Sequence, residues 1–143
     1  MKWTHRLSKA SYVLVALALA GCATTAGDSL ALRVTGAEEV PPVATSASGT
    51  GTIRVADDRG VSGSFTTQGA AITAAHIHEG AAGQNGPVVI PLQKRGDNQW
   101  VVPSGARLTE AQYNAYKQGR LYVNFHSAKH KGGEIRAQIR PSR

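Results

Sequence analysis

Three histidines are the residues of this chain whose type and spacing best suit chemistry. His76 and His78 are separated by one residue in a run that alternates between polar and apolar side chains. Alternate side chains of a β-strand project from the same face about 7 Å apart, so these two imidazoles should point the same way. Neutral imidazole nitrogen is a common ligand of zinc and copper, and two on one face could chelate such an ion.

Further polar side chains occupy two later alternating runs. One run ends in His126, on the face that also carries Asn124, and the last run, 134–140, begins with Glu134. We therefore predict a mononuclear copper or zinc site. Its predicted ligands are His76, His78 and His126, and Glu134 and Asn124 are predicted to orient the imidazoles by hydrogen bonding.

Spacing alone leaves other interpretations open. A His-x-His pair on a strand also occurs as an exposed or hydrogen-bonded pair, in a domain that is purely structural or binds a protein without metal. His130 lies in a basic, glycine-containing loop and is the weakest candidate ligand. The adjacent carboxylates Glu38–Glu39 and Asp57–Asp58 would project to opposite faces of a strand, so we interpret them as solvated turn residues rather than a glycosidase pair.

The elements that must position these side chains are short strands. Alternating runs separated by Gly, Asp, Asn and Pro predict an all-β fold, an antiparallel, Greek-key-like β-sandwich. The predicted strands are 30–35, 50–55, 60–67, 72–78, 88–92, 99–102, 120–126 and 134–140. A hairpin turn is expected at 57–60, with Gly60 at positive φ.

One short helix interrupts this pattern. Residues 108–119 have helical spacing of Leu108, Ala115 and Tyr116, which predicts that one side of the helix packs on the sandwich. Thr109 and Gln112 are spaced as a capping box at its start. Gly119 is expected just beyond its last turn.

The N-terminus carries an export signal. Lys2, Arg6 and Lys9 precede an apolar run too short to span a bilayer, and the run ends in Leu-Ala-Gly-Cys at 19–22. This tetrapeptide resembles the bacterial lipobox, which implies removal of residues 1–21 and acylation (palmitate included) of Cys22. The mature chain would have a tether at 22–29 and a domain at 30–140, and would attach to the cell-envelope membrane without crossing it. Ala23, in place of Asp, favours the outer membrane, facing the periplasm or the cell surface.

Charge and cysteine content restrict the partners. The chain of 143 residues has a formal charge of +7, of which the leader supplies three positive charges. The remaining basicity is dispersed, so we predict no nucleic-acid partner but contacts with the membrane, a metal ion and an envelope protein. The single cysteine is assigned to the anchor, which leaves no disulfide. We find no Gly-x-Ser-x-Gly motif and no phosphate-binding loop, and we assign no catalytic residues.

Four segments together resemble the CHRD domain family, named for chordin and common in bacterial envelope proteins. They are VTGAEEVPPVATSASGT at 34–50, AAHIHEG with NGPVVIPL at 74–80 and 85–92, LTEAQ at 108–112, and LYVNFH with GGEIR at 121–126 and 132–136. The resemblance implies a β-sandwich that acts as a binding module. It also makes His76, His78, Asn124, His126 and Glu134 the polar positions of interest.

A fainter resemblance is to the copper-ligand strands of Cu/Zn superoxide dismutase. It implies His76, His78 and His126 as copper ligands and an alternative function as a copper-dependent redox enzyme. The chain has no histidine-rich zinc loop, no bridging histidine and no disulfide, so a dinuclear site is excluded and only a copper site remains in this interpretation.

Overall fold

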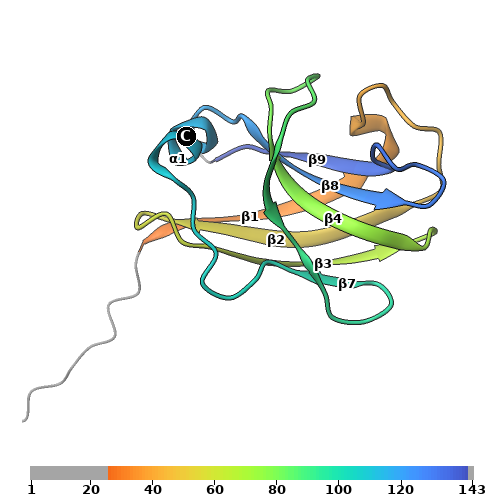
Figure 1. Ribbon diagram of the computed structural model, residues 1–143, viewed down its shortest axis with the longest axis horizontal. Helices are drawn as coiled ribbons and strands as arrows, with labels where there is room; N and C mark the ends of the chain where they lie inside the picture. Colours follow the sequence, from red (N-terminus) through yellow and green to blue (C-terminus); the bar gives the residue numbers. More distant parts are fainter. Residues whose placement is uncertain (1–25, 142–143) are drawn as a thin grey trace, which may run out of the picture.

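A computed structural model describes residues 26–141 of the chain as a two-layered antiparallel sandwich with one helix (Figure 1). The predicted leader and Cys22 lie outside the described residues. The elements, in chain order, are β1 (Gly27–Thr35), η1 (Gly36–Glu38), β2 (Ser48–Ala56), β3 (Val61–Gln68), β4 (Ile72–Glu79), β5 (Val88–Pro91), β6 (Gln93–Lys94), β7 (Gln99–Val101), α1 (Glu110–Lys117), β8 (Leu121–Ser127) and β9 (Ile135–Ile139). The predicted all-β sandwich is confirmed.

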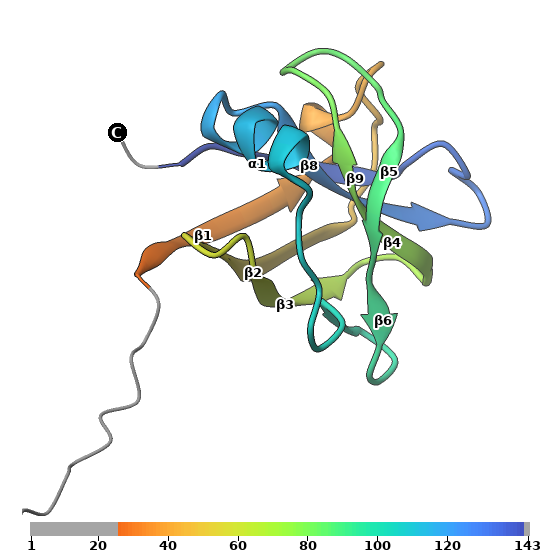
Figure 2. The same cartoon turned by 60° about the vertical axis from the view of Figure 1, so that its left-hand side comes forward.

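The strands follow one another in the order β5-β4-β8-β9-β1-β2-β3-β7-β6. The two layers join where β1 and β9 pair only at Thr35 and Arg136. At the opposite edges, β5 pairs with β4, and β6 pairs with β7. Strand β6 follows β5 almost directly along the chain (Figure 2). One stretch of chain therefore links the outer edges of both layers, so the sheet is nearly closed around its core.

The core fills the space between the layers. Phe125 of β8 packs edge to face on Phe65 of β3, with ring centroids 5.4 Å apart, and on Trp100 of β7, at 6.4 Å. The inner-face residues of β4 and β8 are fully buried, as alternation predicted: Ala75, Ile77, Leu121, Val123 and Phe125. The other face of these strands is therefore the face that carries the histidines.

The helix forms where the sequence predicts it. Thr109 accepts a hydrogen bond from the backbone N–H of Gln112, whose side chain accepts one from the backbone N–H of Thr109, so the capping box is complete. Gly119 follows the helix at φ 67°, and the N–H groups of Gly119 and Arg120 donate to the carbonyls of Tyr116 and Ala115. Ala115 and Tyr116 are buried, as expected of the packed side.

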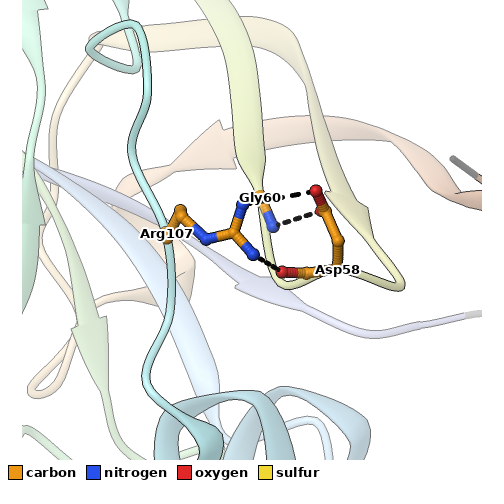
Figure 3. Close-up of polar contacts among 3 residues, drawn as sticks. All are labelled: Asp58, Gly60 and Arg107. Carbon is orange, nitrogen blue, oxygen red and sulfur yellow. Dashed lines mark hydrogen bonds and ion pairs between the residues drawn. The ribbon is translucent and has the colours of Figure 1, made fainter.

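The β2–β3 turn is predicted correctly in place but not in conformation. Arg59, not Gly60, takes the positive φ, of 73°. The Asp58 carboxylate accepts hydrogen bonds from the Gly60 N–H at 2.9 Å and from Arg107 at 3.3 Å, and Arg107 also donates to the Asp58 carbonyl (Figure 3). These side-chain bonds constrain the turn and stabilise the left-handed residue, which composition alone does not reveal.

No helix between residues 26 and 141 is long and apolar enough to cross a membrane.

Candidate metal centre

The three predicted histidine ligands meet on the outer face of the layer formed by β4, β8 and β9, three strands that lie together in Figure 1. His76 and His78 alternate along β4, opposite Asn124 and Tyr122 of β8. His126 pairs with Ala74, one step further along. The antiparallel pairing of β4 with β8 therefore brings together residues about fifty positions apart in the chain.

The distances between the imidazole nitrogens suit the binding of one ion by all three histidines. One potential ligand atom from each histidine lies within 4.8 Å of the others, and His76 Nδ1 is 3.1 Å from His126 Nε2. Two nitrogens bound tetrahedrally at about 2.05 Å from zinc are roughly 3.3 Å apart. The His76–His126 pair already has about this separation, and no pair would have to close by more than about 1.5 Å for such an ion.

Backbone carbonyls fix the protonation of two imidazoles. His78 Nδ1 lies 3.0 Å from the Gly86 carbonyl, and His126 Nδ1 lies 2.9 Å from the Lys131 carbonyl. A carbonyl can only accept, so each Nδ1 carries the proton and donates. A neutral imidazole has one N–H, so Nε2 of both residues has a free lone pair, the arrangement typical of a metal-bound histidine.

One of these lone pairs has no partner among residues 26–141. Within this range His78 Nε2 is buried and makes no hydrogen bond, whereas His126 Nε2 accepts one from His76 Nδ1. Leaving a buried acceptor unpaired costs about 1–3 kcal/mol, so the His78 position favours a bound species that accepts a lone pair. A metal ion fits this donor set.

Burial keeps the cluster neutral. Desolvation is the largest cause of a lowered pKa at each of the three imidazoles. The neighbouring imidazoles lower the pKa of His76 further, and the Arg136 charge lowers that of His78. Neutral imidazoles need not release a proton to bind an ion near neutral pH. The His76 proton, which lies on Nδ1 in the hydrogen bond to His126, has to move to Nε2 before Nδ1 can bind the ion.

The two predicted orienting residues have other partners. Glu134 accepts a 2.6 Å hydrogen bond from Thr45, and Asn124 donates to Glu39 at 3.4 Å. Among the described residues, the three imidazoles hydrogen-bond instead through the His76–His126 pair and to the Gly86 and Lys131 carbonyls. The sequence could not indicate these carbonyls, because they belong to loops whose course depends on the rest of the fold.

Glu39 is buried, contrary to the prediction that both acidic pairs are solvated turn residues. It is only 4% exposed rather than solvated, and burial raises its pKa to about 7 although the Arg136 charge lowers it. Gly133 passes so close that a Cβ there would lie 2.7 Å from Glu39 Oε1. The other three residues of the two acidic pairs, Glu38, Asp57 and Asp58, are exposed, as expected.

Tyr122 and Arg136 also belong to the surroundings of the site, although the sequence analysis assigns neither of them a role there. Tyr122 stacks on His78, with ring centroids 4.9 Å apart and planes 8° apart, and the Arg136 guanidinium lies 3.4 Å from the Tyr122 ring centroid. The alternation placed both residues on the histidine face, which was the available signal.

The chain matches one known family of domains. The CHRD domain family model matches residues 30–139, most of the chain, including every residue of the histidine cluster. Searches of curated proteins and of solved structures gave no match.

Proposed function

We propose that this chain, which belongs to the CHRD domain family, binds one copper or zinc ion through His76, His78 and His126. Family membership supports the broader role of a binding module. The observation that carries the proposal is the buried, unpartnered Nε2 of His78 next to two further imidazoles whose nitrogens lie within 4.8 Å.

The chemistry of the donors favours these two metals. Zinc and copper accept imidazole nitrogen readily, whereas magnesium and calcium prefer oxygen ligands. The cluster offers three nitrogens and no carboxylate among the described residues. A bound ion would supply Lewis acidity, and copper would also supply one-electron chemistry.

Calorimetric titration of the purified full chain with Zn(II), and separately with Cu(II), tests this proposal. We expect one ion per chain, and we expect His78→Ala to weaken binding more than the about 10- to 100-fold typical of losing an outer hydrogen-bonding partner. His130→Ala is the matched control, because His130 lies outside the cluster, and it should bind as the wild type does. Equal affinity of all three proteins would refute the ligand assignment.

Copper-dependent redox activity is a second candidate function. It is favoured by the partial exposure of His76 and His126, which gives small molecules access to the cluster. A copper-loaded chain should then dismutate superoxide, and His126→Ala should abolish the activity. A copper-loaded wild type without activity would leave binding as the function.

Lipid anchoring through Cys22 belongs to the same proposal. It is supported by the Leu-Ala-Gly-Cys sequence and by the start of the folded domain, at Gly27, only five residues later. Such an anchor would hold the domain at the envelope membrane, where an envelope protein or a metal ion could reach it. Cys22→Ser should move the protein from the membrane fraction to the soluble fraction; unchanged fractionation would contradict the anchor.

A further inference from the structure

Arg136 lies at the centre of the polar face and makes most of its contacts with one loop. It is 1% exposed and is the second residue of β9. Its Nη1 donates to the Asn85 side chain at 3.2 Å, and its Nη2 donates to the carbonyls of Gln84 at 3.0 Å and Ala81 at 3.4 Å. These three hydrogen bonds connect the 80–87 loop to the sheet.

The end of this loop touches the metal centre. The Gly86 carbonyl accepts a hydrogen bond from His78 Nδ1–H at 3.0 Å, and the Gly86 N–H donates one to the Tyr122 hydroxyl at 3.0 Å. A Cβ at Gly86 would lie 1.7 Å from the Glu79 carbonyl oxygen, so only glycine lets the loop approach β4 this closely. The position of the Gly86 carbonyl therefore depends on how the rest of the loop is held.

A stack of planar groups provides a second connection. The Arg136 guanidinium lies over the Tyr122 ring, whose other neighbour in the stack is the His78 imidazole. Stacking of this kind restricts the rotation of both rings. Arg136 is thus connected to His78 by two indirect routes, one through the loop that carries the Gly86 carbonyl and one through the Tyr122 ring.

We propose that Arg136 is a positioning residue of the metal centre: by holding the 80–87 loop, it places the Gly86 carbonyl that keeps the proton on His78 Nδ1 and leaves Nε2 free for the ion. The inference rests on the proposed metal binding. Lysine is a poor substitute, because a single ammonium cannot reproduce the planar fork that reaches two carbonyls and an amide while lying flat on a ring.

The protonation of the imidazoles in the metal-free chain gives a test that does not require metal. Nitrogen-15 NMR distinguishes the Nδ1–H from the Nε2–H form of each histidine. In Arg136→Lys and Asn85→Ala we expect His78 to change from Nδ1–H to a mixture of both forms. His126 should stay Nδ1–H in the same samples, because its partner is the Lys131 carbonyl of a different loop.

Two variants control for a failure of Arg136→Lys to fold and for a general effect of replacing an arginine. Asn85 is exposed, so Asn85→Ala removes one of the hydrogen bonds from Arg136 to the loop without removing a buried charge. This variant therefore still tests the inference if Arg136→Lys does not fold. Arg140→Lys is the matched control, an exposed arginine directly after the same strand, and should leave His78 as Nδ1–H. His78 unchanged in folded Asn85→Ala and Arg136→Lys would overturn the inference.

Zinc titration of the same proteins connects this result with function. We expect about 10- to 100-fold weaker binding in Asn85→Ala and Arg136→Lys, and unchanged binding in Arg140→Lys. If the wild type binds zinc and both Asn85→Ala and Arg136→Lys bind it with the same affinity, the inference is overturned. A wild type that binds neither zinc nor copper would refute the proposed function, whereas an altered His78 protonation in the variants would still establish that Arg136 positions His78.

Discussion

The inner face of β4, β8 and β9 is filled by apolar side chains that meet the opposite layer, whereas the outer face of the same strands carries histidines, Asn124 and Arg136 beneath loops. Both faces are largely buried. The side chains of the inner face are stabilised by packing. Among residues 26–141, five buried polar side-chain atoms have no hydrogen-bond partner: Trp100 Nε1 and Tyr116 Oη in the core, and Glu39 Oε1, His78 Nε2 and Asn124 Oδ1 at the outer face. Native proteins rarely leave such atoms unpaired, and the three at the outer face belong to ionisable or amide groups, so this face is the better candidate for a role other than stability.

The largest expected effect on stability belongs to the inner face. Phe125 and His126 are neighbours on β8 that point to opposite faces, so they form a matched pair. Phe125→Ala should lower the free energy of unfolding by about 4 kcal/mol, through lost burial and a cavity. His126→Ala should cost only about 1 kcal/mol in the metal-free chain. Urea unfolding measures both values, and equal losses would contradict the distinction between the faces.

A smaller effect should come from Glu39 and depend on pH. Its pKa rises from 4.5 to about 7 on folding, so between these values the folded chain holds a proton that the unfolded chain has released. The free energy of unfolding should therefore fall as the pH rises through this window, by up to about 3 kcal/mol at about 1.4 kcal/mol per pKa unit. Glu39→Gln cannot ionise and should lack this decline.

Urea unfolding of the wild type and of Glu39→Gln between pH 4.5 and 8 measures this difference. Glu38→Gln is the control, because Glu38 is exposed on the neighbouring position and should leave the wild-type pH dependence unchanged. Parallel curves for wild type and Glu39→Gln would contradict the buried, protonated state of Glu39.

The smallest effect on the free energy of unfolding should come from protonation of the three histidines at acidic pH. Their pKa values are lowered in the fold, so below the usual value of 6.5 the unfolded chain binds more protons than the folded chain. Stability contributed by the neutral cluster is thus present above pH 6.5 and lost as the pH falls through the folded pKa values. Zinc should move this loss to lower pH in the wild type but not in His78→Ala. Identical acid transitions with and without zinc would argue against a metal bound at the cluster.

Alternation predicted which residues share a face, but not what covers that face. The period of two placed Ile77, Val123 and Phe125 inward and His76, His78 and His126 outward, and the structure confirms both sets. Strand pairing was not predictable from spacing, so the convergence of β4 with β8 required the fold. The burial of Glu39 likewise depends on a loop from another part of the chain and on the close approach of Gly133.

Features that depend on residues close together in the sequence could be predicted from the sequence. The capping box of Thr109 and Gln112 and the glycine after α1 involve residues a few positions apart, and both were recognised. The Arg59 conformation was missed because the bond from Arg107 to Asp58 joins residues 49 positions apart. The same limitation hid the Gly86 and Lys131 carbonyls and the role that we propose for Arg136.

The most direct test of a three-histidine metal site is the X-ray absorption spectrum of the full chain loaded with one equivalent of zinc. We expect three imidazole nitrogens at about 2.0–2.1 Å from the ion in the wild type, and fewer in His78→Ala. A coordination sphere of oxygen atoms alone, or zinc that washes off the wild type as readily as off His78→Ala, would contradict this expectation.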